Sequence, residues 1–583
     1  MLLKIKPIIK MEKSKTNPNK DFYGKTLTGV EIFVRSLIEE NVDVIFGCPG
    51  NIVLGIFDAI LEISGIKIVL TRHELGAILS ASGYARATGK PGVVLASSGP
   101  GASNLVTGIA DANMDSTPLV IFTAQVPTKL IGNETFQEVD IVGITRPITK
   151  HNFLVTKIEE LTNIIKSAFY IATTGRPGPV LVDMPRDILS EKFIFDYPEK
   201  VEIRGYNPIY SAHSGQIKRA AEIINNSSKP VIIAGGGVII SNAFGELREF
   251  ARKINSPVAT TLMGQGVYPE DDPLSLGMIG MHGTWYANTA VNESDCIIVI
   301  GSRLDEKVTG DFNRFAPKAK KIHIDIDPAS ISKNIKADIP IVGDVKDALK
   351  KLIPLVKNLN NEEWLSQIKK WKNEHPLKYK TTDKVCVQFV IEKLRDLTGA
   401  NAVIVTDVGQ FQMWTAQFFK FLYPRTHITS GGLGTMGFSL PASIGVATAV
   451  KDRPVISING NRGFQINMQE LATIKTYNLP IKILIFNDGH IDITRQWQEL
   501  HWRKRFDEIL IDSSCPDFTK IADAYGIQSF KVELSNDVEP TLKKALALKD
   551  KPVLIEFKTI YEENIYPYIP IGGSINDIIE GGE

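Results

Sequence analysis

VISINGNRGF, residues 455–464, is the stretch that decides the fold class. It begins with a short, mostly apolar and β-branched run, which leads directly into a turn that contains Gly460 and Gly463. Continuous runs of this kind, in contrast to alternating ones, are typical of strands buried on both faces of a parallel sheet. The turn then lies at the carboxyl end of the strand, which is the edge where α/β sheets bind ligands. The stretch therefore predicts a parallel sheet with a ligand site beside it.

Runs of the same kind occur in three groups along the chain. They cover residues 42–46, 67–70, 93–96, 119–122 and 180–182, then 231–234, 258–261, 296–300 and 321–325, and finally 402–405, 455–458, 481–486 and 552–556. Polar bridges at residues 193–214 and 359–384 separate the groups and are the candidate linkers. The pattern predicts an α/β protein with three doubly wound parallel-sheet domains.

The domain boundaries follow from these bridges. We expect domains at residues 24–192, 215–358 and 385–583, the last of which ends in a C-terminal tail. Residues 1–23 are rich in Lys and poor in apolar pattern, so we expect a disordered N-terminal tail there. A chain of 583 residues is also too long for one core and fits about three domains.

Composition narrows the kinds of partner. The chain has 66 Lys and Arg residues against 65 Asp and Glu residues, which gives no electrostatic footprint for nucleic acid or an anionic membrane surface. No apolar run approaches the ~18 residues that a membrane span needs. The four cysteines form no CxxC pair, which argues against a zinc site or a disulfide framework and favours a reducing, cytoplasmic location. A small-molecule substrate is the expectation.

Two motifs follow strands of the first group. Residues 72–77 (RHELGA) open a helix and carry Glu74, and residues 98–104 (SGPGASN) form a glycine-rich turn that lets a ligand approach the backbone. Each has an ordinary structural explanation. A Glu in a first helical turn is commonly a partner of the helix dipole, and the second motif alone is a common strand-to-helix loop.

Two strand-end turns of the third group carry candidate metal ligands. Asn461 follows the run at 455–458, and Asp488 follows the run at 481–486. An amide and a carboxylate at neighbouring strand ends could place two oxygen ligands around one hard cation such as Mg²⁺, which completes its shell with water and phosphate oxygens. The alternative is a pair of ordinary turns.

The order of the motifs and the residues around them point to one family. The words in question are RHELGA, SSGPGASNL, QVP, IGNETFQEVDIVGITRPITKH, RPGPVLVDMP, GMIGMHGT, HIDIDP, DVGQFQMW, TSGGLGTMGFSLPA, NMQELAT and RQWQEL. Together they resemble the successive motifs of acetolactate synthase catalytic subunits, which are thiamin-diphosphate-dependent enzymes. The resemblance runs from Gly24 to the tail near residue 579, and FQEVDIVG and RQWQEL are specific to this branch of the thiamin enzymes.

The resemblance implies an architecture and an activity. The three domains would be a pyrimidine-binding domain, a central FAD-binding-like domain and a diphosphate-binding domain. Thiamin diphosphate would lie between the first domain of one subunit and the third domain of another, so a homodimer or homotetramer is implied, and a small regulatory subunit could accompany it. The enzyme would decarboxylate pyruvate and transfer the two-carbon unit to pyruvate or 2-oxobutanoate, forming acetolactate or acetohydroxybutanoate for branched-chain amino acid biosynthesis.

The resemblance also assigns roles to residues of this chain. Glu74, which would hydrogen-bond the pyrimidine ring, and Gln137 would be catalytic. The implied cofactor-binding residues are Gly409, Gln410, Gly434, Met436, Gly460, Arg462 and Gly463, and the implied magnesium ligands are Asn461, Asp488 and His490. Substrate would contact Phe136, Arg186, Lys307 and Trp497, where the indole gives apolar contact to the extra methylene of 2-oxobutanoate. Residues 235–237, 280–284 and 325–328 match words that line a structural FAD.

The chain departs from the family pattern at both ends of the expected site. Asn461 stands where relatives have Asp and Asp488 where they have Asn, which we interpret as a reciprocal exchange that keeps one carboxylate. Arg462 replaces a small residue, and Phe411 replaces a His that would donate to phosphate. Near the substrate, residues 51–52, 186 and 306–307 also differ. An active but divergent enzyme is the expectation. The alternatives are another thiamin-dependent 2-oxo acid carboligase or decarboxylase, and a catalytically silent paralogue.

Overall fold

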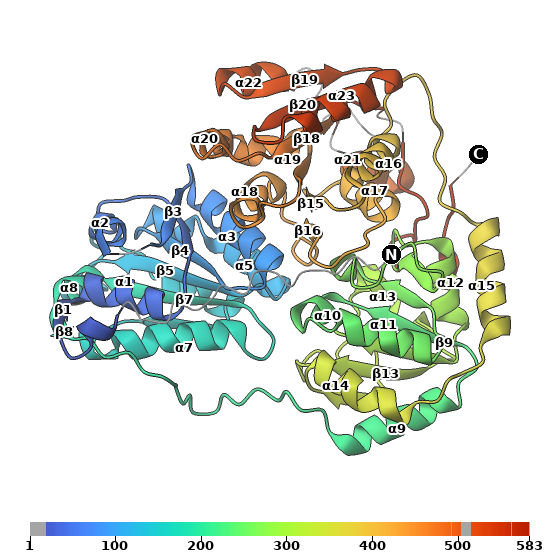
Figure 1. Cartoon of the computed structure of the whole chain (residues 1–583), viewed down its shortest axis with the longest axis horizontal. Coiled ribbons are helices and arrows are strands. Elements are labelled where there is room, and N and C mark those ends of the chain that lie inside the picture. The colour runs from blue at the N-terminus through green and yellow to red at the C-terminus, as the bar shows by residue number, and fades with distance from the viewer. Residues whose placement is uncertain (1–18, 64, 491, 503–514, 561–562, 582–583) are drawn as a thin grey trace.

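A computed structural model describes residues 19–63, 65–490, 492–502, 515–560 and 563–581, and it contains three six-stranded sheets (Figure 1). The strand orders are β3-β2-β4-β5-β7-β6, β11-β10-β9-β12-β13-β14 and β16-β15-β17-β18-β20-β19. Neighbouring strands within these three sheets run parallel. The prediction of three parallel α/β units is confirmed.

The N-terminal sheet carries the first two motifs. Its strands are β2 (Val44–Gly47), β3 (Lys67–Leu70), β4 (Gly92–Ala96), β5 (Leu119–Gln125), β6 (His151–Leu154) and β7 (Pro179–Pro185). The helices around it include α1 (Gly29–Glu39), α2 (Leu54–Ile63), α3 (Glu74–Thr88), α4 (Pro100–Ser103), α5 (Val106–Met114), α6 (Ile141–Thr145), α7 (Leu161–Thr173) and α8 (Arg186–Ser190). Short strands β1 (Thr26–Thr28) and β8 (Lys192–Ile194) pair antiparallel beside them.

The central sheet is formed by β9 (Pro230–Ala234), β10 (Val258–Thr260), β11 (Ser275–Met278), β12 (Cys296–Ile300), β13 (Lys320–Asp325) and β14 (Ile339–Val342). Its helices are α9 (Ser214–Asn225), α10 (Gly236–Ile240), α11 (Phe244–Lys253), α12 (Trp285–Glu293), α13 (Glu306–Thr309) and α14 (Val345–Leu352). Helix α15 (Glu362–Glu374) lies within the second predicted linker. It packs on this unit because Trp364 is buried there and donates from Nε1 to the Pro230 carbonyl at 3.3 Å.

The C-terminal sheet contains β15 (Val403–Thr406), β16 (His427–Thr429), β17 (Val455–Gly460), β18 (Lys482–Asn487), β19 (Gln528–Val532) and β20 (Val553–Lys558). Its helices are α16 (Val387–Thr398), α17 (Gln410–Phe418), α18 (Ser439–Ala449), α19 (Asn461–Asn467), α20 (Leu471–Thr476), α21 (Asp492–His501), α22 (Phe518–Ala524) and α23 (Ser535–Ala547). Residues 455–464 form β17 and the start of α19, as the pattern predicts.

Helices α3 and α18 join the N-terminal and C-terminal units (Figure 1). Two glycines let their backbones touch. A Cβ on Gly83 would lie 2.0 Å from the Ala442 carbonyl oxygen, and a Cβ on Gly445 would lie 1.8 Å from the Ser80 carbonyl oxygen. One hydrophobic cluster runs through both units here, from Val94 and Ile121 in the N-terminal sheet to Ile444 and Ile483 on the C-terminal side. The two units therefore share part of their core.

Two segments outside the sheets were predicted to lack regular structure, namely the first linker and the N-terminal tail. Residues 195–213, all of them described, form no helix or strand, in keeping with the first predicted linker. Of the predicted disordered tail, residues 1–18 lie outside the described residues. Its remaining part packs on α1, because Asn19 donates from Nδ2 to the Arg35 carbonyl at 2.9 Å and the Arg35 guanidinium lies 3.2 Å from the centre of the Phe22 ring. Among the helices that the structure describes, none is both long and apolar enough to cross a membrane.

Candidate functional site at the strand ends

Glu74 is the first residue of α3, and three residues separate it from the end of β3. Its Oε2 atom accepts a hydrogen bond from Nδ2 of Asn104 at 2.9 Å, and Asn104 belongs to the glycine-rich turn that follows β4. Glu74 is half-buried, and its Oε1 would lie 3.4 Å from a Cβ on Gly101 of the same turn. The structure thus brings together the two motifs of the N-terminal sheet that the sequence singled out.

Gln137 lies against the same turn. A Cβ on Gly99 would approach the Cα, Cβ and carbonyl oxygen of Gln137 to 3.0 Å each. Both residues adopt left-handed backbone conformations, with φ of 60° at Gly99 and 61° at Gln137. Such a conformation is uncommon for a residue other than glycine and often marks a functional loop. The neighbouring Phe136 is 87% exposed, so this loop presents a large apolar side chain to the outside of the chain.

The turns that follow β15, β17 and β18 lie side by side at one edge of the C-terminal sheet. The register pairs Thr406 with Ile458 and Gly460 with Phe486, so the carboxyl ends of these strands are adjacent. Gly409, Gln410, Asn461, Arg462, Gly463 and Asp488 all lie in or next to these turns. Gln410 is buried and donates from Nε2 to Gln496 Oε1 at 2.9 Å and to the Glu563 carbonyl at 3.0 Å. Both hydrogen bonds of the Gln410 amide nitrogen are therefore made to other residues of this chain.

The expected magnesium ligands have the following contacts. Asn461 is 1% exposed, and its Oδ1 accepts from the backbone N–H of Arg462 at 2.7 Å. Its Nδ2 is buried and has no hydrogen-bond partner among the described residues. Asp488 Oδ1 accepts from the His490 N–H at 2.9 Å, and Nδ1 of His490 lies 2.8 Å from the Asp488 carbonyl. No group of three or more His, Cys, Asp and Glu side chains suited to a metal occurs in the described ranges.

Asp407 is a site residue that the sequence reasoning missed. It follows β15, is fully buried, and accepts from the N–H groups of Val408 at 2.7 Å and Gly437 at 2.9 Å. A Cβ on Gly463 would lie 2.4 Å from its Oδ2, so the carboxyl group joins two turns of the site. Burial raises the pKa of Asp407 to about 7, although these N–H groups oppose the shift. The sequence feature that could have indicated Asp407 is an acidic residue directly after a buried strand, at the start of the motif DVGQFQMW.

Phe411 and Arg462, the two departures beside the diphosphate turns, have different environments. Phe411 is 1% exposed, and its ring centre lies 6.4 Å from that of Phe486 in the hydrophobic core. The position where the resemblance implied a phosphate donor therefore contributes packing in this chain. Arg462 is exposed at the start of α19.

A cavity of about 500 Å³ lies where the three units meet, because its lining includes Arg176 of the N-terminal unit as well as residues of the central and C-terminal units. Its lining contains glycines and an acid from the words matched to a flavin site, namely Gly236, Gly237 and Asp325. Its lining also contains Lys307, Trp497 and Gly434, which sequence reasoning assigned to substrate and thiamin. The Lys307 Nζ lies 5.5 Å from the centre of the Trp497 ring. Burial raises the pKa of Asp325 to about 6.

Other predicted residues lie outside this cavity. Glu74, Phe136, Gln137 and Arg186 are all on the N-terminal unit and are not among the described residues that line the cavity. Arg186 is exposed at the start of α8. Within one chain the predicted residues therefore fall into two groups, one at the strand ends of the N-terminal sheet and one shared by the other two sheets.

Comparison with protein families matches each sheet in turn. Residues 27–144 match the family model "Thiamine pyrophosphate enzyme, N-terminal TPP binding domain". Residues 217–352 match the central domain of the same enzymes, and residues 407–557 match their C-terminal TPP binding domain. Fold and site thus define a thiamine pyrophosphate enzyme.

Full-length relatives narrow this class. The chain is 46% identical over 561 residues to an acetolactate synthase large subunit of Buchnera aphidicola (subsp. Schizaphis graminum). The aligned region covers 95% of this chain and 98% of the relative. This chain is 43% identical to that of Haemophilus influenzae, with the same coverage. It is 46% identical to a probable acetolactate synthase large subunit of Methanocaldococcus jannaschii, with 95% of each chain covered. The chain belongs to the acetolactate synthase large subunit family.

Proposed function

We propose that this chain catalyses the thiamin-diphosphate-dependent carboligation of two 2-oxo acids in branched-chain amino acid biosynthesis. Pyruvate would be decarboxylated, and its two-carbon unit would be joined to pyruvate or 2-oxobutanoate to give acetolactate or acetohydroxybutanoate. The observation that carries the proposal is the grouping of Glu74, Asn104 and the Gln137 loop, in a chain that matches acetolactate synthase large subunits over 95% of its length.

Glu74 is the proposed proton-handling residue. Thiamin diphosphate, when bound, supplies stabilisation of the negative charge that develops on the two-carbon unit. The hydrogen bond from Asn104 occupies Oε2 and holds the carboxyl plane, so Oε1 is the atom that would bond a ring nitrogen of the pyrimidine. A carboxyl group whose rotamer is fixed by a neighbouring donor is well suited to hold and return one proton at a defined position.

The two groups of site residues support an active site completed by a second subunit. Glu74 and Gln137 belong to the N-terminal unit, whereas Gly434 and Met436 belong to the C-terminal unit, and of these four residues only Gly434 lines the cavity. Phe136 is 87% exposed and Leu433 is 43% exposed, so each presents apolar surface that a second chain could cover. A homodimer or homotetramer is therefore part of the proposal, and a small regulatory subunit and a cytoplasmic location stay predictions from the sequence.

The diphosphate end fits a magnesium-bound diphosphate. The buried Nδ2 of Asn461 has no partner in the described chain, and a phosphate oxygen would satisfy it. Asp488 supplies the carboxylate and His490 the third proposed ligand, while the exposed Arg462 guanidinium is suited to paired bonds with phosphate oxygens. Gly409, Gly460 and Gly463 would let the backbone approach the cofactor.

The cavity fits a flavin with a structural role. A volume of about 500 Å³ lies within the range of pockets for drug-sized ligands, and Gly236 and Gly237 are among the residues that line it. FAD would be held by the central unit, with Asp325 near its polar part. The ultraviolet and visible spectrum of the purified protein tests this proposal, because bound oxidised flavin absorbs visible light and the polypeptide alone does not.

A second candidate function rests on Lys307. The Lys307 ammonium group lies over Trp497 inside the cavity, where it could pair with a carboxylate on the acceptor. An acceptor 2-oxo acid that is larger or carries an additional negative charge would then be preferred. A competition between 2-oxobutanoate and 2-oxoglutarate as acceptors separates this candidate from the first.

The test of the proposed function is an assay of the purified protein with pyruvate, thiamin diphosphate, Mg²⁺ and FAD, with acetolactate as the readout. Product formation that is lost in Glu74→Gln supports the proposal. Absence of product together with thiamin-diphosphate-dependent stabilisation moves the function to another 2-oxo acid. Absence of both would contradict the enzyme assignment and favour a silent paralogue, since a bound ligand must raise stability by mass action.

A further inference from the structure

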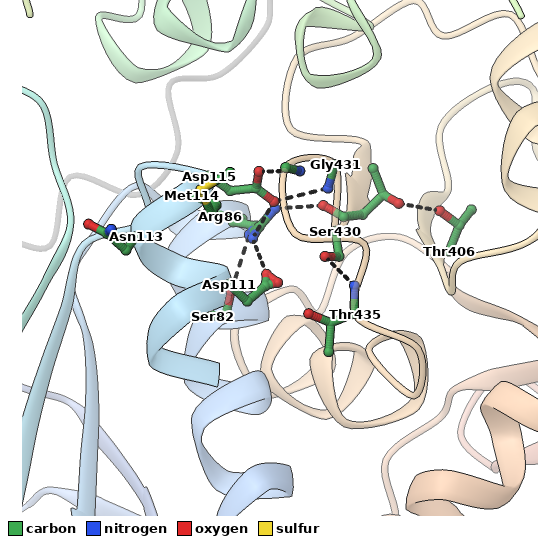
Figure 2. Close-up of polar contacts among 12 residues, drawn as sticks. Ser82, Arg86, Asp111, Asn113, Met114, Asp115, Thr406, Ser430, Gly431 and Thr435 are labelled. Carbon is green, nitrogen blue, oxygen red and sulfur yellow. Dashed lines mark hydrogen bonds and ion pairs between the residues drawn. The ribbon is translucent and has the colours of Figure 1, made fainter. Parts of the chain in front are cut away.

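A buried group of three charged side chains connects the N-terminal unit to the loop that carries Gly434 and Met436 (Figure 2). We call residues 430–437 the cofactor loop, and Arg86, Asp111 and Asp115 the interdomain clamp. Arg86 lies near the C-terminal end of α3, Asp111 lies in α5, and Asp115 directly follows α5. The side chains of Asp111 and Asp115 are 0% exposed, and that of Arg86 is 11% exposed.

Asp115 contacts the cofactor loop directly. Its Oδ1 accepts from the backbone N–H of Gly432 at 2.7 Å, and its Oδ2 accepts from the N–H of Gly431 at 3.0 Å. One carboxylate thus holds two consecutive backbone groups at the start of the loop. Hydrogen bonds to a charged acceptor are stronger than neutral ones, and the side chain that accepts these two is 0% exposed. The C-terminal end of a helix disfavours a carboxylate, so Asp115 is placed for this contact and not for the stability of α5.

Arg86 ties the carboxylates to the strand before the loop. Its guanidinium donates to the Thr429 carbonyl at 2.6 Å and forms ion pairs with Asp115 at 3.0 Å and with Asp111 at 3.2 Å. The Asp111 carboxyl lies beside the hydroxyl groups of Ser430 and Thr435. Within the loop, Ser430 Oγ accepts from the N–H of Thr435 at 2.9 Å (Figure 2). The clamp is therefore in contact with the start of the loop and with Thr435.

We propose that the interdomain clamp positions the cofactor loop, so that side chains of the N-terminal unit set the affinity for thiamin diphosphate without touching it. The proposal rests on the proposed role of Gly434 and Met436 in binding the cofactor. A loop that is only partly in its binding conformation lowers the apparent affinity by the fraction that is competent. The clamp raises that fraction, because release of the loop would deprive the buried Asp115 carboxylate of two hydrogen-bond donors.

The experiment compares Asp115→Asn and Asp115→Ala with a matched control. Asp295 of the central unit accepts from the N–H groups of Ser228 at 2.8 Å and Lys229 at 3.1 Å, so Asp295→Ala removes the same kind of contact from a loop without a proposed role. The first measurement is the dissociation constant of thiamin diphosphate with Mg²⁺, followed by protein fluorescence. The second is hydrogen exchange of the amides at residues 430–437, measured without cofactor.

The expected result is a dissociation constant about tenfold or more higher in Asp115→Ala, a smaller increase in Asp115→Asn, which keeps one acceptor oxygen, and no change in Asp295→Ala. Turnover at saturating cofactor should fall less than affinity, and the loop amides should exchange faster in both Asp115 variants. Unchanged affinity and unchanged exchange in Asp115→Ala would overturn the proposal. Failure of the unsubstituted protein to bind thiamin diphosphate would refute the proposed function, whereas loop exchange would still decide whether the clamp holds the loop.

Discussion

Gly445 of α18 lies against the carbonyl oxygen of Ser80 in α3, so closely that a Cβ at residue 445 would be 1.8 Å from that oxygen. Two helices that meet at backbone distance transmit the position of one unit to the other with little freedom. Because α3 begins at Glu74 and contains Arg86, this contact positions a proposed proton-handling residue and the interdomain clamp at the same time.

Gly445→Ala should therefore destabilise the protein. The added methyl group must push the two helices apart, and overpacking of this kind costs about 1 to 3 kcal/mol. Thermal unfolding measures the change. Gly55→Ala in α2 is the control, since nothing lies within 4 Å of the added Cβ and an exposed helical Gly→Ala change is neutral or slightly stabilising. Equal midpoints for the two variants would contradict the close contact.

Glu74→Gln should abolish acetolactate formation while the fold persists. The Gln carbonyl can still accept from Asn104, but the side chain no longer exchanges a proton at working pH. Loss of a general acid or base lowers turnover by about 10² to 10⁴-fold. Turnover at saturating pyruvate is the measurement, and an unchanged unfolding midpoint shows that the loss is chemical. Turnover within a factor of two of the original protein would remove Glu74 from the mechanism.

The reciprocal exchange at the metal turns can be tested by counting carboxylates. Asp488→Asn leaves no acid at the pair and should weaken Mg²⁺ binding, whereas Asn461→Asp adds a second acid and should strengthen it. The double substitution keeps one carboxylate and should return close to the original affinity. The measurement is a Mg²⁺ titration of thiamin-diphosphate-dependent stabilisation. A severe loss of affinity in the double variant would refute the interpretation as a charge-preserving exchange.

Asp407 should make the protein less stable as pH rises. Burial raises its pKa from 3.8 to about 7 in the folded state, so the folded protein holds this proton more tightly than the unfolded chain does. Its stabilising contribution is complete below about pH 4 and is lost as pH rises through about 7. Asp407→Asn keeps an acceptor for Val408 and Gly437 but does not titrate, and it should flatten the pH dependence of the unfolding midpoint over this window. An unaltered profile would show that Asp407 does not cause it.

Trp497→Ala should reduce the preference for 2-oxobutanoate over pyruvate as acceptor. Loss of apolar contact to one methylene costs about 1 to 3 kcal/mol, which corresponds to roughly tenfold or more in the product ratio. The ratio of acetohydroxybutanoate to acetolactate from a mixed-substrate assay is the measurement. Trp502→Ala is the matched control. Trp502 directly follows α21, the helix that contains Trp497, but it is 55% exposed. An equal product ratio in the two variants would assign the preference elsewhere.

Strands buried on both faces were predictable from the sequence because burial requires continuous apolar runs. The residues predicted for β12, which is buried throughout, agree with the structure at both ends, and so do those predicted for the edge strand β3. Edge strands β6 and β19 were not predicted, since their residues are mostly half-buried or exposed and carry no continuous apolar signal. The turns that follow the predicted strands could be located because the apolar runs mark where each strand ends. The structure brings two of these turns together, since Glu74 contacts the 98–104 turn.

Contacts between segments far apart in the chain could not be predicted from the sequence. Asp115 bonds a residue 316 positions away, and nothing in the local pattern around it differs from an ordinary helix end. The cavity shared by Asp325 and Trp497 likewise depends on how two sheets are placed relative to each other. Phe411 shows the same limit, because a resemblance implied the role of its position but not that a Phe side chain there would join the core.

The crossing of α3 and α18 also affects how the chain is made. Gly445 follows Gly83 by roughly 360 residues, and ribosomes add about 5 to 20 residues per second. The face of α3 that α18 covers therefore remains bare for about 20 to 70 seconds during synthesis. Over that period, the newly made N-terminal sheet presents an apolar surface with no partner, and the cell must protect it from aggregation until the last quarter of the chain emerges.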